Sequence, residues 1–263
     1  MNTKTRFEEH WVNIPRERLD RYEQMFAWNP ATAPFYTAAD VCEGHCIVDF
    51  GCGPGHAAIE FAKWVGPHGH VHAMDINAEF IARAKVRAHD NGMAQSITHH
   101  LLEDQSVPLP DGSVDRIIVR NTLIYVPDPI YTLREFYRCL KPGGLVHAIE
   151  GDWRLTAVEP VPTPEWRALI EAASGAWPRP EIGRSLYGIA KQAGFLEVSV
   201  HVLTSPDTTG RLKGMIDTVS GYARESGKMD LERIERILTQ VEGAIANGTY
   251  LAISPQFVVT ARI

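Results

Sequence analysis

Short apolar segments alternate with amphipathic segments between residues 45 and 150, and this alternation limits the possible folds more than any other feature of the sequence. Buried strands are predicted from apolar runs at 45–50, 70–75, 96–101, 114–119 and 145–150. Helical spacing separates them, with helices predicted at 57–65, 78–92 and 129–140. Strands that alternate with helices are joined by right-handed crossovers into a parallel sheet. The middle of the chain is therefore predicted to be an α/β domain.

The two ends of the chain depart from this rhythm. Residues 16–28 have the spacing of one helix, which Pro30 and Pro34 would end. The later elements are expected to be helices at 163–177 and 183–194, a strand at 196–203, a helical stretch at roughly 208–246 and a last strand at 255–263. No internal repeat and no linker is visible, so we expect these helices to be additions to one domain.

The composition is typical of a globular protein and disfavours several classes of partner. Of 263 residues, 44% are hydrophobic, and a formal net charge of −6 gives no reason to expect a polyanionic partner. No cluster of Lys and Arg with interleaved aromatic residues is present, which disfavours nucleic acid. The N-terminus is charged, no apolar run reaches membrane-spanning length, and no C-x-x-C pair occurs. We therefore expect a cytoplasmic protein, monomeric or homodimeric, that binds neither nucleic acid nor membrane.

Two groups of potential metal ligands occur in the sequence. Cys42, His45 and Cys46 lie close together, but no second cluster completes a set of four ligands. Histidines also alternate over 68–72, on one face of a predicted strand of which only the carboxyl end would meet a ligand. We expect no metal site and assign the alternating histidines a structural role.

A glycine-rich turn follows the first predicted strand, in the segment VDFGCGPGHAA at residues 48–58. A strand that runs through a glycine turn into a helix is the general arrangement of a nucleotide site at the carboxyl edge of a sheet. Gly51 and Gly53 fit the dinucleotide fingerprint G-x-G-x-x-G, but histidine occupies its third glycine position. The segment instead reads D-x-G-x-G-x-G, from Asp49 to Gly55. Either glycine pattern alone is weak evidence for the identity of the ligand.

Further motifs follow the glycine turn in a fixed order. Asp75 stands at the end of the second predicted strand, and LPDGSVD, YVPDP and LKPGG occupy residues 109–115, 125–129 and 140–144. LKPGG is expected to be a tight turn before the fifth strand. The ordered set resembles the class I S-adenosylmethionine (SAM)-dependent methyltransferases, particularly the small-molecule branch that includes ubiquinone/menaquinone C-methyltransferase-like proteins. The resemblance covers residues 45–150 well and the rest of the chain only in general layout.

The resemblance implies a Rossmann-like, doubly wound α/β fold. Its sheet would have seven mostly parallel strands with an antiparallel last strand, and helices would be added at the N-terminus and before that strand. We expect a single methyltransferase domain over 1–263, with an N-terminal helical lid at 1–40, a SAM-binding core at 41–150, and substrate-cap helices and closing strands at 151–263. The implied activity is transfer of a methyl group from SAM to an oxygen, nitrogen, carbon or sulfur atom of a small metabolite, leaving S-adenosylhomocysteine.

The resemblance also implies which residues bind the cofactor. Asp75 lies 20 residues after Gly55 at a strand end, where its carboxylate would accept two ribose hydroxyls and also cap the following helix. In the family an acidic residue after the third strand binds the adenine amino group, and here Glu103 and Asp104 both remain candidates. The expected cofactor-binding residues are Asp49, Gly51, Gly53, Gly55, Asp75, Ile76, Glu103, Asp104 and Asn121.

Methyl transfer from SAM makes modest demands on the protein. The sulfonium is already a strong electrophile, so the protein mainly has to align the acceptor and exclude water. A general base is needed only if the acceptor loses a proton early. The candidate catalytic residues are His56, Tyr125, Glu150 and Asp152, and no spacing singles one of them out.

Aromatic residues in the flanking segments suit a flat or apolar small-molecule acceptor. The expected substrate-binding residues are Trp28, Tyr36, Arg120 and Trp153. For each aromatic residue, packing of the added helices onto the sheet is an equal alternative. Arg120 could instead form a salt bridge at the end of its strand.

Two other classes of function stay open at this point. A nicotinamide- or flavin-dependent oxidoreductase would use the same type of sheet, but His56 in place of the third glycine counts against it. LPDGSVD and LKPGG count against it as well. A SAM-binding protein with chemistry other than methyl transfer also fits, because a fold alone does not set the reaction.

Overall fold

The computed structural model describes residues 11–177 and 179–263. Contacts between Cα atoms separate the chain into two compact units. The first comprises the described residues up to Ile149, together with Ser185–His201 and Val258–Ile263. The second comprises the described residues of Glu150–Arg184 and Val202–Phe257. Residues 1–10 of the expected lid lie outside the described residues.

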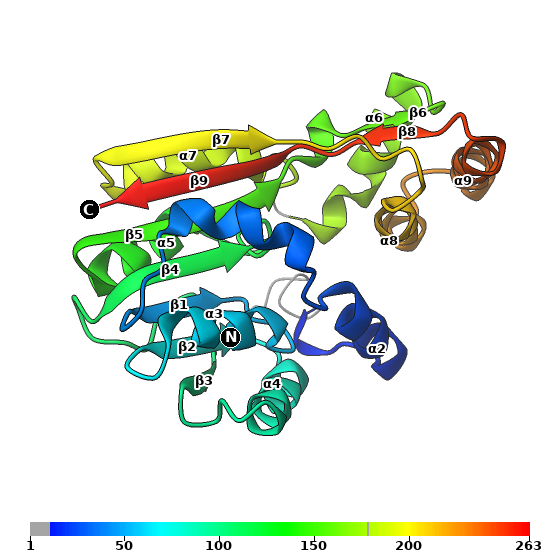
Figure 1. Ribbon diagram of the computed structural model, residues 1–263. Coiled ribbons are helices and arrows are strands. Elements are labelled where there is room, and N and C mark those ends of the chain that lie inside the picture. The colour runs from blue at the N-terminus through cyan, green and yellow to red at the C-terminus, as the bar shows by residue number, and fades with distance from the viewer. Residues whose placement is uncertain (1–10, 178) are drawn as a thin grey trace, which may run out of the picture. The chain divides into compact units, whose positions relative to one another are not determined.

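A seven-stranded sheet has the strand order β3-β2-β1-β4-β5-β9-β7. Its strands are β1 (Cys46–Phe50), β2 (His70–Asp75), β3 (Ile97–Leu101), β4 (Val114–Arg120), β5 (Leu140–Gly151), β7 (Glu197–Leu203) and β9 (Gln256–Arg262). Strands β1 to β5 pair in parallel, and the β9 arrow runs against those of its neighbours β5 and β7 (Figure 1). The predicted mostly parallel sheet with an antiparallel last strand is confirmed.

The helices that follow the strands begin where the sequence provides caps and glycine turns. The crossover helices are α3 (His56–Val65), α4 (Ala78–Asp90), α5 (Pro129–Cys139) and α7 (Ile182–Ala193). Helix α3 starts at Gly55 in a left-handed conformation, and the Asp128 side chain caps α5. Parallel strands end at one edge of the sheet, so the segments after β1, β2 and β4 meet there.

The N-terminal part of the first unit contributes α2 (Arg16–Met25) and the 3-10 helix η1 (Pro30–Ala39). Backbone carbonyls of η1 accept hydrogen bonds from two sheet side chains. His147 Nε2 donates to Phe35 O at 2.8 Å, and Arg116 Nε donates to Ala39 O at 2.9 Å. These bonds seat η1 on the β4–β5 part of the sheet.

The second unit contains helices α6 (Thr163–Ala173), α8 (Lys213–Ser226) and α9 (Leu231–Asn247), with short 3-10 turns η2 (Trp153–Leu155) and η3 (Ser174–Ala176). A small antiparallel pair, β6 (Ala157–Glu159) with β8 (Leu251–Ile253), completes it. Within the described ranges 11–177 and 179–263, no helix combines the length and the apolar character that a bilayer crossing requires.

Three local features were not predicted from the sequence. The helical stretch at 208–246 is two helices, because Gly227 takes a left-handed conformation (φ 64°) that ends α8. LKPGG is part of β5 rather than a separate turn, although the pairing jumps from Val114–Leu140 to Arg116–Leu145. The segment after Pro30 was expected only to end a helix, yet it forms η1.

Candidate functional site

The glycine turn after β1 is fixed by contacts with the protein itself. Gly51 has φ 77°, and a Cβ atom on it would lie 2.5 Å from Thr122 Cγ2. Gly55 has φ 83°, and its Cβ would lie 2.7 Å from the Cβ of Ala84 on α4. Real Cβ atoms do not approach so closely, so both positions require glycine for packing as well as for backbone conformation. The turn is thereby held between the end of β4 and α4.

Gly53 differs from its neighbours in what covers it. Its φ is 53°, and a Cβ there would lie 3.5 Å from Phe26 Cδ2, an ordinary van der Waals distance. The Gly53 N–H donates to Asp75 Oδ2 at 2.8 Å. The middle of the turn is therefore tied to the end of β2 and lies against the Phe26 ring.

Asp75 organises the segment after β2 through its carboxylate. Besides Gly53, it accepts a bond from the backbone N–H of Asn77 at 2.9 Å. Burial raises the pKa of Asp75 to about 6, and backbone N–H groups, that of Ile76 included, oppose the shift. A carboxylate can accept about four hydrogen bonds, so three backbone donors leave capacity for a ligand hydroxyl.

The expectation that Asp75 also caps the next helix was wrong. The N-cap of α4 is Asn77, whose Oδ1 accepts from Phe80 N at 2.8 Å. Its Nδ2 donates to Trp11 O at 2.6 Å, which ties the chain before α2 to this edge of the sheet. Asp75 is thereby left to hold the glycine turn.

Asp49 is buried at the end of β1, and its Oδ2 has no hydrogen-bond partner within the described part of the chain. Burial, with a smaller contribution from the charge of Asp75, raises the pKa of Asp49 to about 7. A buried acceptor without a donor is costly, and such groups concentrate at functional sites. Asp49 thus fits an ammonium group or another donor from a ligand.

The raised pKa of Asp49 predicts a pH effect on stability. Between about pH 4 and pH 7 the folded protein keeps the proton while the unfolded chain releases it. The free energy of unfolding therefore falls as pH rises, by up to about 1.4 kcal/mol per pH unit for this one group. Asp49→Asn removes this slope. In urea unfolding, the free energy of unfolding of the variant relative to that of wild type should therefore increase by about 2 kcal/mol between pH 5 and pH 7.

Two histidines with lowered pKa values supply the control for this measurement. Burial lowers the pKa of His72 and of His147 to about 4, so their contribution to stability rises with pH. That opposite slope is common to wild type and Asp49→Asn and cancels in the comparison. Parallel pH profiles for the two proteins would contradict the assignment.

The two acidic residues after β3, Glu103 and Asp104, differ in their hydrogen bonding. Asp104 Oδ1 accepts from Ser106 N at 2.8 Å and also from the Ser106 hydroxyl, which lowers the pKa of Asp104. Glu103 is exposed, and its carboxylate takes part in no hydrogen bond or ion pair with the residues that the structure describes. Glu103 is therefore the better of the two candidates for a ligand.

The segment after β4 carries backbone strain. Asn121 has φ 50°, one of two non-glycine residues with positive φ in the described ranges, and its N–H donates to Ile149 O at 2.9 Å. A left-handed non-glycine residue is uncommon, and strain of this kind clusters at functional sites. Tyr125 follows, and its ring meets the Trp11 ring edge-on at 4.8 Å between centroids.

His56, at the start of α3, has a structural partner. Its Nε2 lies 3.1 Å from Glu23 Oε1 on α2. Burial, followed by the charge of Arg87, lowers the pKa of His56. The imidazole therefore joins α3 to α2 through Glu23.

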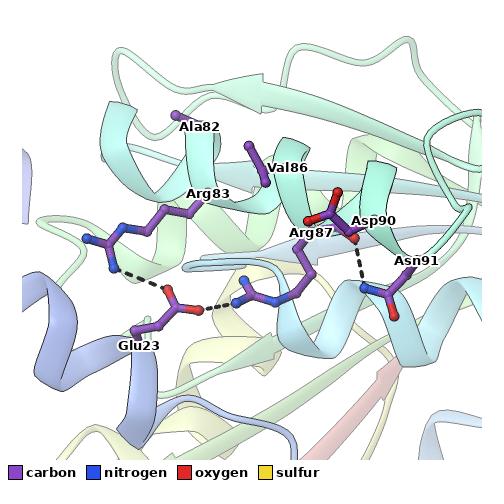
Figure 2. Close-up of a pocket in the computed structure, with 7 residues that line it drawn as sticks. All are labelled: Glu23, Ala82, Arg83, Val86, Arg87, Asp90 and Asn91. Atoms are coloured by element: carbon purple, nitrogen blue, oxygen red, sulfur yellow. Dashed lines mark hydrogen bonds and ion pairs between the residues drawn. The ribbon is translucent and has the colours of Figure 1, made fainter.

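Glu23 is the centre of a larger cluster of charges (Figure 2). Its Oε2 lies 3.4 Å from Arg83 Nη1, and Arg87 Nη2 also bonds to its carboxylate. Arg87 donates in addition to the carbonyl of Pro54 in the glycine turn. Glu23, Arg83 and Arg87 line a cavity of about 480 Å³. Glu23 pairs with both arginines and Arg83 pairs also with Asp20, so we assign the cavity no ligand. The cluster instead fastens α2 to the glycine turn.

Trp28 and Tyr36 belong to an aromatic cluster of the first unit. Their rings stack at 5.7 Å between centroids, and Phe61 and Trp64 meet both of them. Tyr36 is only 4% exposed. Packing of the N-terminal segment accounts for both residues, although Tyr36 Oη also accepts a bond from Arg120 Nη1 at 3.2 Å.

The second unit contains the remaining candidates. Asp152 is buried; its Oδ2 lies 2.6 Å from Arg184 Nε, and its Oδ1 caps η2 by accepting from Arg154 N at 3.0 Å. These partners join the start of the second unit to Arg184 at the beginning of α7. Glu150 is 1% exposed, and Trp153 stacks on Trp177 at 4.9 Å between centroids.

The cysteine and histidine motif forms a local turn. Cys42 N donates to His45 Nδ1 at 3.1 Å, and Cys46 lies at the start of β1. Within residues 11–177 and 179–263, no three His, Cys, Asp or Glu side chains are grouped as a metal ion would need. His45 Nδ1 already accepts a hydrogen bond from the backbone N–H of Cys42.

Several residues of the edge were not foreseen from the sequence. Glu23, Phe26, Asn77, Arg87 and Thr122 all contact the glycine turn or its supports. Only Asn77 had a local signal, because asparagine directly before a helical stretch is a preferred N-cap. The others reach the turn from positions distant in sequence.

Comparison with known proteins gives one family for the core. Residues 47–144 match the family described as methyltransferase domain. The ubiquinone/menaquinone biosynthesis C-methyltransferase UbiE of Cellvibrio japonicus is 35% identical over 113 residues, which are 43% of this chain and 45% of that relative. The chain spans less than half the length of the first curated relatives it matches.

Solved structures agree with this at the level of the fold. A SAM-dependent methyltransferase from Aquifex aeolicus has a TM-score of 0.53 at 21% identity, over 73% of this chain and 93% of that one. The YcgJ protein from Bacillus subtilis has a TM-score of 0.62 at 17% identity, over 88% of this chain and 97% of that one. At these identities the likeness shows the fold alone.

Proposed function

We propose that this chain, whose residues 47–144 match the methyltransferase domain family, is a class I SAM-dependent methyltransferase that transfers a methyl group from SAM to a small-molecule acceptor. The observation that carries the proposal is the Asp75 carboxylate. It stands at the end of β2, is held by the N–H groups of Gly53 and Asn77, and keeps capacity to accept further hydrogen bonds. A carboxylate so placed suits the two hydroxyls of a ribose.

The residues at the sheet edge fit the parts of such a cofactor. Asp75, with Ile76 beside it, would take the ribose, and Glu103 would take the adenine amino group. Asp49 would receive the amino group of the methionyl end, for which its buried Oδ2 lacks a protein donor. Gly51, Gly53 and Gly55 shape the turn, and Asn121, after β4, would lie beside the methyl group of the cofactor. Asp104 is left out because Ser106 already engages it.

Bound SAM supplies a methyl group on an electrophilic sulfonium. The chain's own residues then need to orient the acceptor and exclude water. The Trp11 and Tyr125 rings present aromatic surface after β4, which is attractive to a cation. Tyr125 and Glu150 remain our candidates for a general base, because His56 and Asp152 are held by Glu23 and Arg184.

The acceptor is proposed to be a small metabolite, methylated at carbon, nitrogen, oxygen or sulfur. The name of the UbiE relative refers to C-methylation in ubiquinone/menaquinone biosynthesis, which favours carbon as the first atom to test. Trp28 and Trp153 stay proposed contacts of the acceptor. The composition supports a cytoplasmic protein that uses no nucleic acid.

Ligand-induced stabilisation separates SAM binding from the oxidoreductase alternative. S-adenosylhomocysteine at 100 times its dissociation constant should raise the free energy of unfolding by about 2.7 kcal/mol. NADH at the same concentration should leave it unchanged. Differential scanning fluorimetry detects the effect of each ligand as a shift in the melting temperature. A higher melting temperature with NADH but not with S-adenosylhomocysteine would overturn the proposal. A higher melting temperature with S-adenosylhomocysteine, in a protein that methylates no acceptor, would favour other SAM chemistry.

We also propose that the N-terminal segment up to residue 40 is a lid over the cofactor, that 41–150 is the SAM-binding core and that 151–263 caps the acceptor. Three contacts support the lid. Phe26 lies against Gly53. The side chain of Asn77 donates a hydrogen bond to the carbonyl of Trp11. Glu23 is ion-paired with Arg87, which also donates to the carbonyl of Pro54 in the glycine turn.

The lid predicts a kinetic effect at Glu23. Glu23→Gln removes the charge that Arg83, Arg87 and His56 share, and partly buried ion pairs of this kind contribute about 1 kcal/mol. The dissociation rate of S-adenosylhomocysteine should rise about three-fold or more, which stopped-flow displacement measures. Glu17→Gln, on an exposed position of the same helix, is the matched control. Equal dissociation rates for the two variants would remove the lid from the account.

A further inference from the structure

Two arginines on β4 lie on the same side of the sheet, because they are four residues apart on one strand. Arg116 is 7% exposed and its guanidinium is fully engaged. Its Nε donates to Ala39 O at 2.9 Å, its Nη1 to Asp115 O at 2.9 Å, and its Nη2 lies 3.3 Å from Asp40 Oδ2. Arg116 shows what a structural arginine of this strand looks like.

Arg120 is different. Its Nη1 donates to Tyr36 Oη at 3.2 Å, but its Nε is buried without a hydrogen-bond partner. Among residues 11–177 and 179–263, no carboxylate lies within ion-pair distance of it, so none of these residues forms the salt bridge considered from the sequence. A buried donor without an acceptor costs about 1–3 kcal/mol, and more when the group is charged. Folding alone does not explain why this arginine is kept there.

The position of Arg120 is that of the proposed site. Phe50 pairs with Val119, so the next residues, Gly51 and Arg120, lie side by side where β1 and β4 end. Tyr36, which holds one end of the guanidinium, is itself buried and stacked on Trp28. The cation is therefore held in place at the carboxyl edge, beside flat aromatic surface.

We propose that Arg120, positioned by Tyr36, binds a carboxylate of a ligand at this edge of the sheet. The guanidinium offers a planar set of N–H donors that matches a carboxylate, and its Nε is the donor left without a partner. This inference rests on the proposed function, because the carboxylate belongs either to the methionyl end of the cofactor or to an acidic acceptor. In the second case the acceptor is a small acid with a flat or apolar body.

Two binding measurements distinguish these sources. Calorimetry with Arg120→Met compares S-adenosylhomocysteine with 5′-methylthioadenosine, which has the same nucleoside and sulfur but no carboxylate. The same variant is then titrated with sodium benzoate, a flat carboxylate probe, with and without S-adenosylhomocysteine. Arg134→Met on the exposed side of α5 is the matched control for loss of one positive charge. Arg120→Lys keeps the charge should the methionine variant fail to fold.

Arg120 binds the cofactor carboxylate if Arg120→Met lowers the affinity for S-adenosylhomocysteine by about ten-fold or more and leaves the affinity for 5′-methylthioadenosine unchanged. Loss of benzoate binding with S-adenosylhomocysteine unchanged assigns it to an acidic acceptor. In either case Tyr36→Phe should produce a smaller loss for the same ligand, because it removes only the positioning bond.

Two results would overturn the inference. The first is that Arg120→Met binds both S-adenosylhomocysteine and benzoate with an affinity within two-fold of wild type. The second is that Arg120→Met loses the same affinity for S-adenosylhomocysteine as for 5′-methylthioadenosine, which a merely structural role would cause. A wild-type protein that binds neither nucleoside contradicts the proposed function instead. The benzoate titration still reports on Arg120 in that case.

Discussion

Asp75→Ala should weaken the binding of S-adenosylhomocysteine by about ten-fold or more, because charge-assisted hydrogen bonds to the ribose are lost. The variant also removes the acceptor of the Gly53 and Asn77 N–H groups. Buried donors left without partners cost about 1–3 kcal/mol, so the free energy of unfolding should fall by a similar amount. Isothermal titration calorimetry and urea unfolding measure the two effects separately.

A second substitution at the same position separates charge from shape. Asp75→Asn keeps the size of the side chain but can accept only through one oxygen, so it should restore part of the stability and little of the affinity. Asp104→Ala is the matched control, since that carboxylate is exposed and bound to Ser106. Unchanged affinity in Asp75→Ala would remove Asp75 from the cofactor site.

Gly51→Ala should destabilise the protein more than any other single change considered, by about 3 kcal/mol or more. The new Cβ would lie 2.5 Å from Thr122 Cγ2, and the residue would have to keep φ 77°. Both the clash and the backbone strain act on the glycine turn, which forms part of the proposed cofactor site. Urea unfolding should therefore show a lower midpoint, and binding of S-adenosylhomocysteine should be lost with it.

Matched glycines separate the two causes. Gly92→Ala has a similar φ of 70° and nothing within 4 Å of the new Cβ, so it measures the strain without the clash. At Gly55 the clash is with Ala84, and Gly55→Ala combined with Ala84→Gly should recover part of the loss. Equal destabilisation by Gly51→Ala and Gly92→Ala would show that close packing at Gly51 contributes nothing.

The sequence was sufficient where the information is local. Apolar runs and helical spacing locate β1 to β5 and their helices, because each element buries one face of its own segment. The sheet order and the antiparallel β9 came from the resemblance, since pairing of distant strands leaves no local trace. Gly227 ends α8 although the apolar spacing of α9 begins only four residues later, so periodicity alone joined the two helices.

The site divides in the same way. Asp49, Asp75 and the glycines could be placed at one edge because parallel strands end together. Glu23, Phe26 and Arg87 could not, because they act on the turn through tertiary contacts between α2, α4 and Pro54. The cap of α4 was misassigned to Asp75 because two polar residues precede the helix and only backbone geometry separates their roles.

The most direct test of this account is the position of S-adenosylhomocysteine in a crystal structure of the complex. We expect the adenosyl group at the carboxyl ends of β1 to β3, with both ribose hydroxyls within hydrogen-bond distance of the Asp75 carboxylate. A complex in which Asp75 contacts no ligand atom, and the nucleoside binds elsewhere on the chain, would contradict it.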